Sequence, residues 1–418
     1  MEARHSTVRD LRRRNRSALL SKLFFEGPLS RLELSRLTSL SAATVSNVTG
    51  ELVDERLVVE AGLVDSDGGR PRVLLRVNPG YGHVVGIDVG ETGVKAELFD
   101  LSMERLVTVD QPLHSPRPDP ATVVTQVAAA LGAVLHQGGI EEQSVLGVGI
   151  GVPGTVEQGP GVLVHAQAIG WNAVPFEELL RAAGVRLPLF VDNGAKTQGQ
   201  AELWFGAGRG AGHAVIVLVG SGVGAAVITN GTTYRGATSS AGEWGHTTIV
   251  YDGRPCRCGA KGCLEAYVGA EAILDRYRQA RGGRAVPGSD EQSSLAALVA
   301  AEGRSPTAAR VLQDTAGYLG AGMADLINLF NPERIVLGGW TGVALRGLLP
   351  QIRASAAAHA LRHAYEQTTI ELCELGPDAV AFGAATLPVA ALLARGGDPR
   401  LDRRATRSRA GTAGADVA

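Results

Sequence analysis

The first 80 residues alternate short amphipathic stretches with polar turns. Residues 8–25 carry apolar side chains at helical spacing and are followed by a Gly-Pro pair, which predicts a helix that ends there. Ser30, with Glu33 three residues later, has the pattern of a capping box and predicts the start of a second, short helix. A third helical stretch covers residues 41–57. Two short helices joined by a tight turn, after a longer helix, predict a helix-turn-helix.

The segment after these helices has the pattern of a wing. Residues 57–64 and 73–78 are apolar runs typical of strands, and residues 65–72 between them are polar. Arg70 and Arg72 flank a proline at the predicted tip, where the proline keeps the chain extended. Arginines in such a position can enter a DNA minor groove.

The predicted third helix opens with small polar side chains that suit base edges and phosphates: Ser41, Thr44, Ser46 and Asn47. Together with the wing, they predict that residues 1–78 form a winged helix-turn-helix domain that binds double-stranded operator DNA. The alternative is a three-helix bundle without a DNA role, which the basic tip and the polar helix face disfavour.

Beyond residue 80 the hydrophobic pattern changes. Residues 84–100 and 214–231 each contain an apolar strand, a glycine-bearing turn and a second apolar strand, which predicts two hairpins. A dinucleotide-binding motif would instead pass from a strand into a helix. Two similar hairpins suggest two related lobes, each turning backbone N–H groups toward a shared cleft. Predicted strands and helices alternate along most of the remaining chain, so we expect an α/β protein.

Composition and charge narrow the class of protein. A chain of 418 residues with 45% hydrophobic residues is expected to form two or three domains with substantial cores. The net charge is −2, yet residues 1–80 carry 13 Lys and Arg against 10 Asp and Glu. A basic N-terminal segment in an otherwise slightly acidic chain indicates a nucleic-acid-binding domain joined to a second domain with another role. The alternative is that these charges lie on a solvent-exposed helix face.

The sequence shows no sign of a membrane segment. No uninterrupted apolar run reaches the length of a membrane span, and no apolar signal core follows the basic start. We therefore expect a cytoplasmic protein with no membrane partner, whose thiols stay reduced and available to a metal.

Three of the four cysteines lie within eight residues, and a histidine precedes them: His246, Cys256, Cys258 and Cys263. Thiolates and one imidazole form a closed ligand set for structural Zn²⁺, and glycines between the cysteines let a short loop wrap a small ion. Unrelated free thiols or a disulfide are the alternatives, and a Cys-x-Cys disulfide would close a strained ring. Glu243 and Glu265 flank this loop, where they would be held in fixed positions as a site for a hydroxylated ligand requires.

Six motifs, in order, resemble those of the ROK family of repressors, open reading frames and sugar kinases, over about residues 81–395. They are IDVGETGVKAELFD, GVPGTVE, GSGVGAAV, AGEWGH, CRCGAKGCLE and NLFNPERIVLGG. The resemblance implies a two-lobed actin-like, ribonuclease-H-like ATPase fold, a zinc motif of the histidine and three cysteines above, and a homodimer or homotetramer. We expect the first lobe to comprise residues 81–191 plus 376–395 and the second lobe residues 192–375, with a disordered tail at 396–418.

The departures from the family pattern are informative. Kinases of the family carry a stretch resembling Glu-Asn-Asp-Ala-Asn, whose aspartate is the base that deprotonates the sugar hydroxyl. The matching residues here are 192–196, and Gly194 stands at the base position, so no catalytic residue is assigned. Ala168 stands where many relatives have a sugar-contacting asparagine. The remaining sugar-contact positions match the family: Asn193, Glu243, His246 and Glu265.

The nucleotide side also departs from the family. The residues that match its two phosphate loops are Asp88, Gly90 and Thr92 in the first and Gly220, Ser221 and Gly222 in the second. Glu91, however, places a negative charge where phosphates would lie. These loops are either an ATP site or a structural relic of one.

Three functions follow from these observations. The first is a transcriptional regulator, a repressor, whose sensor lobes bind a sugar or sugar-phosphate effector. The second is an ATP-dependent sugar kinase with an accessory DNA-binding module. The third is a constitutive DNA-binding protein whose lobes serve only for oligomerisation. Gly194 disfavours the second function, and we expect the first.

Overall fold

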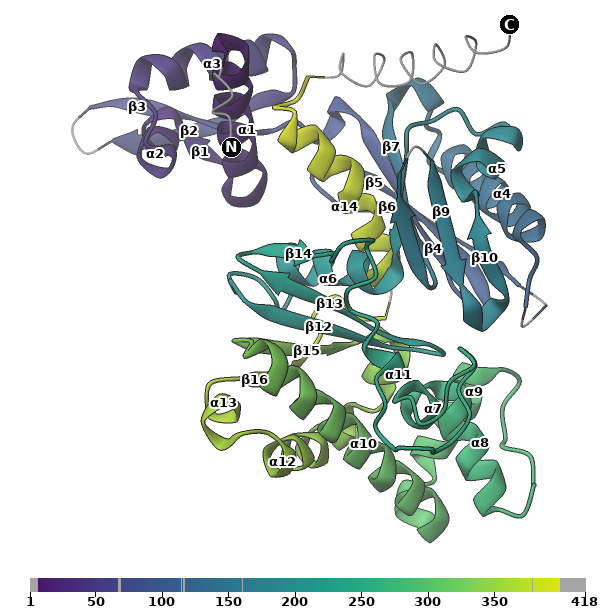
Figure 1. Ribbon diagram of the computed structural model, residues 1–418. Helices are drawn as coiled ribbons and strands as arrows, with labels where there is room; N and C mark the ends of the chain where they lie inside the picture. The colour runs from purple at the N-terminus through teal and green to yellow at the C-terminus, as the bar shows by residue number, and fades with distance from the viewer. Residues whose placement is uncertain are drawn as a thin grey trace, which may run out of the picture.

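The computed structural model describes residues 7–66, 69–113, 115, 117–159, 161–377 and 379–398, except for the side chains of residues 66, 69 and 70. Figure 1 shows a small N-terminal domain in purple, followed by two larger parts that are each built around a five-stranded sheet. We refer to the part with strand order β11-β7-β4-β5-β6 as the first lobe and the part with order β14-β13-β12-β15-β16 as the second lobe.

The N-terminal domain contains the predicted helices and hairpin. Its elements are α1 (Val8–Glu26), β1 (Leu29–Ser30), α2 (Arg31–Thr38), α3 (Ala42–Asp54), β2 (Val58–Ser66) and β3 (Gly69–Val77). The predicted capping box is present, because the Ser30 hydroxyl accepts from the Glu33 N–H and the Glu33 carboxylate accepts from the Ser30 N–H at 2.7 Å. Ser41 caps α3 by accepting from the Thr44 N–H.

The predicted loop over residues 65–72 is wrong in its extent, because Ser66 pairs with Gly69 at the end of the hairpin and Arg70 and Arg72 lie on β3 within three residues of that pair. Strand β3 already begins at Gly69, and Arg72 lies opposite Val64 in the antiparallel pair. The ladder continues through polar residues because its hydrogen bonds join backbone groups, whatever the side chains are. The side chain of Arg70 lies outside the described residues.

In the first lobe, both faces of the sheet are covered. Its strands are β4 (His83–Val89), β5 (Gly93–Asp100), β6 (Arg105–Pro112), β7 (Val145–Val152) and β11 (Leu189–Asn193), and β4 and β5 form the predicted hairpin. Helix α4 (Pro120–Gly138) packs on β5 and β6, and α14 (Ala379–Ala394) packs on β4 and β7. A Cβ at Gly86 or Gly149 would lie within 2 Å of a carbonyl oxygen of α14, so both positions require glycine.

A second, smaller sheet extends the first lobe and was not predicted. It has the order β10-β9-β8, with β8 (Thr155–Gln158), β9 (Val162–Ala166) and β10 (Trp171–Val174), and α5 (Phe176–Ala182) follows it. These strands are only four or five residues long, too short for a hydrophobic period to identify them.

The second lobe contains the predicted hairpin of β12 and β13 and most of the remaining helices. Its strands are β12 (Ala214–Val219), β13 (Val223–Thr229), β14 (Thr232–Tyr234), β15 (Arg334–Gly338) and β16 (Thr369–Leu372). Its helices are α7 (Glu265–Val268), α8 (Ala270–Ala280), α9 (Glu291–Ala300), α10 (Pro306–Phe330), α11 (Gly339–Ala344), α12 (Leu349–His359) and α13 (Arg362–Glu366). One hydrophobic core joins β12 and β15 to α8, α10 and α12.

Two packed helices connect the three parts of the chain. Helix α6 (Gly194–Phe205) follows the last strand of the first lobe and packs on β12 and β13 of the second. It also packs on α14 so closely that a Cβ at Gly383 would lie 1.9 Å from the Thr197 carbonyl oxygen. Figure 1 shows α14, in yellow, extending from this contact to the N-terminal domain. Its end shares a hydrophobic core with α1.

The predicted disordered tail begins too early. Residues 396–398 are described, and the Gly396 carbonyl oxygen accepts a hydrogen bond at 2.8 Å from Nε of the buried Arg16. The remainder of the predicted tail, residues 399–418, lies outside the described residues. Among the helices that are described, none is long and apolar enough to cross a membrane.

Candidate functional site

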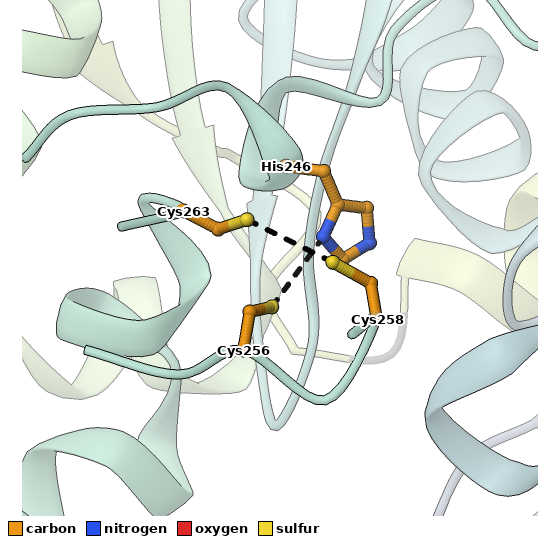
Figure 2. Close-up of side chains that lie close together, drawn as sticks. All are labelled: His246, Cys256, Cys258 and Cys263. Atoms are coloured by element: carbon orange, nitrogen blue, oxygen red, sulfur yellow. Dashed lines mark hydrogen bonds between the residues drawn. The ribbon is translucent and has the colours of Figure 1, made fainter. Parts of the chain in front are cut away.

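The strongest chemical feature is a cluster of one imidazole and three thiols. Figure 2 shows the four side chains pointing toward a common centre: His246, Cys256, Cys258 and Cys263. Their candidate ligand atoms all lie within 4.8 Å of one another. His246 ends a short 3₁₀ turn, while the cysteines come from the loop that precedes α7.

The spacing of these atoms fits a tetrahedral metal site. Sγ of Cys258 lies 3.7 Å from Sγ of Cys263, and Sγ of Cys256 lies 3.7 Å from Nδ1 of His246. Zinc–ligand bonds of about 2.3 Å to sulfur and 2.0 Å to nitrogen give tetrahedral edges of roughly 3.8 and 3.6 Å. A disulfide requires a sulfur–sulfur distance of about 2.05 Å, so the two closest thiols are not bonded to each other.

The loop and its surroundings favour a bound cation. Gly259 and Gly262 have φ of 94° and 77°, which residues with a Cβ rarely adopt, and they let the chain turn between ligands. Burial raises the pKa of the Cys256 thiol to about 12, and burial also raises the pKa of Cys263. Three thiolates this close together need a positive ion to stay ionised, and a zinc ion would supply that charge.

Of the matched sugar-contact residues, Glu243 and Glu265 lie beside this cluster, and the side chains of the group are used differently. The Asn193 side chain caps α6 by accepting from the Lys196 N–H at 3.1 Å and donates to the Gly154 carbonyl oxygen at 2.6 Å. The Glu265 carboxylate accepts from the Val223 N–H at 2.9 Å. The Glu243 carboxylate makes no hydrogen bond within the described part of the chain, while the Glu243 backbone carbonyl accepts from the His246 N–H at 3.1 Å.

Glu243 is the carboxylate of this group best placed to receive a ligand. The Glu243 carboxylate lies close enough to Lys196, His246 and Glu265 to interact with them electrostatically. Burial raises its pKa, and the positive charge of Lys196 opposes the shift. A half-buried carboxylate without a protein donor is a good acceptor for a ligand hydroxyl.

Two cations that sequence reasoning missed hold the loop that carries Glu243. Lys196 is 2% exposed, and its Nζ donates to the Ser239 carbonyl oxygen at 2.6 Å. Burial lowers the pKa of Lys196, while Asp192 and Glu243 oppose that shift. Arg235 donates to both oxygens of the buried Asp192, at 3.0 and 2.5 Å. The charges of Lys196 and Arg235 are visible in the sequence, but the sequence does not identify the groups that they pair with.

At the position of the catalytic base in the kinase pattern, this chain has Gly194, which provides no carboxylate. Gly194 begins α6, and a Cβ added there would meet only ordinary contacts, the nearest being Cγ1 of Val380 at 3.5 Å. Asp192, the neighbouring carboxylate, has both oxygens engaged by Arg235.

An ion pair that sequence reasoning also missed joins the first glycine turn to the cysteine loop. Asp88 lies in β4, and the turn that follows carries Gly90 and Thr92, while the turn between β12 and β13 carries Gly220, Ser221 and Gly222. Glu91 in the first turn pairs with Arg257 of the cysteine loop at 2.5 Å. The Ser221 hydroxyl donates to the Glu291 carboxylate, so it is already engaged within its own lobe.

The residues predicted to bind DNA lie at the start of α3. Ser41, Ser46 and Asn47 are exposed, whereas Thr44 is half-buried and its hydroxyl lies 2.9 Å from that of Ser41. Arg72 is half-buried in β3. These side chains therefore form a small polar surface on one helix end, with the wing strand as a separate element.

Comparisons with known proteins agree on one family. The model of the ROK family matches residues 84–390. A xylose repressor from Caldicellulosiruptor bescii is 29% identical over 389 residues, which cover 92% of this chain and 97% of the repressor.

Two solved structures differ in how much of this chain they match. A ROK family transcriptional regulator, a homolog of the E. coli MLC protein, has a TM-score of 0.76 and 26% identity, covering 93% of this chain and 98% of that one. A ROK family glucokinase from Streptomyces griseus in complex with glucose and AMPPNP has a TM-score of 0.63 and 27% identity, covering 99% of the kinase but 73% of this chain. The regulator thus spans nearly the whole chain, while the kinase leaves over a quarter of it unmatched.

Proposed function

The chain belongs to the ROK family, and we propose that it is a sugar-responsive, DNA-binding transcriptional regulator that acts as a repressor. The observation that carries this proposal is that the N-terminal domain, with its three helices and hairpin, shares one hydrophobic core with α14 and with β4 and β5 of the first ROK lobe. The similarity over nearly the full length to a protein named as a xylose repressor supports it.

The proposed DNA contact is the exposed end of α3. Ser41, Ser46 and Asn47 present hydroxyl and amide groups to solvent at the helix start, where a recognition helix contacts bases and phosphates. Arg70 and Arg72 would add phosphate or minor-groove contacts from the wing strand. As a cytoplasmic homodimer or homotetramer, the protein would place two such helices on two half-sites of an operator.

The proposed effector is a sugar or sugar phosphate bound near Glu243. Glu243 and Glu265 would accept hydrogen bonds from hydroxyl groups, and the Asn193 carbonyl oxygen could accept a second one beside its capping bond. A Zn²⁺ ion held by His246 and the three cysteines would fix the loop between these carboxylates and would contribute structure rather than catalysis.

We infer that the effector signal passes along α6 and α14. Helix α6 begins at Gly194 beside the proposed pocket and ends in an aromatic cluster, in which the rings of Trp204 and Phe25 lie 4.9 Å apart. Helix α14 begins with Val380 against Gly194 and ends against α1. A ligand that moved the lobes would therefore also move the DNA-binding domain, which would change the spacing of two half-site contacts.

Loss of kinase activity is part of this proposal. Gly194 supplies no base, and Arg235 occupies the neighbouring Asp192. Glu91 places a carboxylate and its partner arginine between the two glycine turns, where ATP phosphates would have to lie. Removal of a general base typically costs about 10²–10⁴ in rate. An ATP-dependent sugar kinase with an accessory DNA module is the alternative, supported by the similarity to the glucokinase.

A titration of operator DNA with a panel of free and phosphorylated pentoses and hexoses tests the proposal. We expect one of these ligands to lower operator affinity at least tenfold, the range of ordinary allosteric coupling being about 5–150-fold. Operator binding that no sugar changes would favour a constitutive DNA-binding protein. Sugar-dependent ATP consumption in the same preparation would instead favour the kinase.

A further inference from the structure

The ion pair between Glu91 and Arg257 crosses from one lobe to the other. Glu91 lies in the β4–β5 turn of the first lobe, and Arg257 lies in the cysteine loop of the second, 166 positions away in sequence. The pairing is bidentate, with one terminal guanidinium nitrogen 2.5 Å from Oε2 of Glu91 and the other 3.1 Å from Oε1. Fork-to-fork pairs of this kind are both strong and directional.

The pair also fills the space beside the second glycine turn. Arg257 donates to the Ser221 carbonyl oxygen at 3.2 Å. A Cβ added at Gly222 would lie 3.4 Å from Oε1 of Glu91, so the carboxylate lies directly against the backbone of that turn. Three loops from two lobes therefore meet at one guanidinium group.

The neighbours of Arg257 allow the Glu91–Arg257 pair to break when the lobes move apart. Arg257 has two further carboxylate neighbours in its own lobe, Glu265 at 3.4 Å and Glu271 at 3.7 Å. If the lobes moved apart, Arg257 would keep these partners, and Glu91, whose side chain is 17% exposed, would pass into water. Opening therefore leaves no buried, unpaired charge, which is the main cost of breaking most buried ion pairs.

We propose that Glu91 and Arg257 form an internal latch that holds the two lobes together without a bound nucleotide. The Glu91 carboxylate takes the place of an external anion between the two glycine turns, so closure depends on the chain itself. This latch sets the resting position of the lobes and is independent of whether the N-terminal domain regulates transcription.

Hydrogen–deuterium exchange of the full chain tests the latch. In Glu91→Gln, which keeps the size and removes the charge, we expect exchange in peptides covering residues 88–94 and 219–224 to rise about tenfold, as expected for loss of a charge-assisted hydrogen-bonded pair. Arg257→Lys, which keeps the charge and removes the fork, should give a smaller rise in the same peptides. The matched control is Asp252→Asn, which breaks an exposed pair with Lys261 at 2.8 Å within the same loop and should change neither peptide.

The possible results of the exchange experiment distinguish the latch from its alternatives. A rise confined to the two turn peptides in both latch variants supports the proposal. Wild-type exchange in both variants overturns it, because the lobes would then be held by other contacts. An equal rise across the whole chain also overturns it, because the pair would then stabilise the fold in general rather than the contact between lobes.

Discussion

Replacement of Arg16 by methionine is expected to loosen the attachment of the DNA-binding domain to the lobes. The Arg16 side chain is 9% exposed. Its Nε donates to the Gly396 carbonyl oxygen at 2.8 Å, just beyond α14, and its terminal nitrogens pair with Glu51 of α3 at 3.1 Å and with Glu55, which caps the end of α3, at 2.5 Å. Methionine keeps much of the apolar stem, so the change removes mainly the charge and its hydrogen bonds.

The magnitude follows from how exposed each partner is. A hydrogen bond to a charged group contributes about 1.5–3 kcal/mol, and the buried bond to Gly396 should contribute in that range. Glu51 and Glu55 are 32% and 45% exposed, so their pairs are screened and their carboxylates can turn to water, which limits their share to below about 1 kcal/mol. We therefore expect a loss of about 2–3 kcal/mol, or roughly 30- to 150-fold in the local opening equilibrium.

Hydrogen–deuterium exchange of α1 and of the end of α14 measures this opening. The matched control is Arg13→Met on the same helix, whose side chain is 52% exposed and pairs with Asp10 at 3.5 Å; it should exchange like the wild type. Wild-type protection of α1 in Arg16→Met would refute the reasoning, because the buried arginine would then contribute nothing to the attachment. We also expect Arg16→Met to reduce the effect of a sugar on operator affinity.

Four further predictions concern the proposed sites. Arg72→Ala should weaken operator binding and flatten its salt dependence by about one counterion; wild-type affinity in a mobility-shift titration would remove the wing from the interface. Chelation, or Cys258→Ser, should lower the melting temperature and abolish the response to sugar, and metal analysis of untreated protein should find about one zinc per chain. Burial raises the folded-state pKa of Glu243. The protonated form therefore stabilises the fold at low pH, and that contribution is lost as pH rises through the raised pKa. Glu243→Gln should raise the melting temperature at pH 7 but not at pH 4, and it should weaken sugar binding. In Gly194→Asp the added Cβ would meet only ordinary contacts, yet sugar-dependent ATP consumption should stay near background, because phosphate positioning is still blocked; ordinary kinase rates in this variant would show that a single substitution had removed the activity.

The parts of the fold with strong local signals were predicted from the sequence. The capping box of Ser30 and Glu33 identified the start of α2, because its hydrogen bonds join residues three apart. The two glycine-turned hairpins were predicted for the same reason, since apolar runs on both sides of a short turn pair with each other. The four candidate metal ligands lie within 18 consecutive residues, so their spacing alone indicated a cluster.

Two local predictions failed where the pattern carries little information. The polar residues around Arg72 were placed in a loop, but backbone pairing extends β3 through them. The short strands of the sheet β10-β9-β8 were missed because four or five residues hold too little periodicity.

Only the tertiary structure decided which charges meet. The sequence showed Glu91 as an unexpected negative charge in a glycine turn, but its partner Arg257 lies in another lobe. Lys196 and Arg235 were equally unassigned until the chain brought Ser239 and Asp192 beside them. Helical and strand periods arise from bonds between near neighbours, whereas an ion pair forms wherever folding brings two charges within about 4 Å. The sequence by itself therefore determined the elements with strong local signals, the metal-ligand cluster and the missing base at Gly194, while the contacts that join lobe to lobe and Gly396 to Arg16 depend on packing across the whole chain.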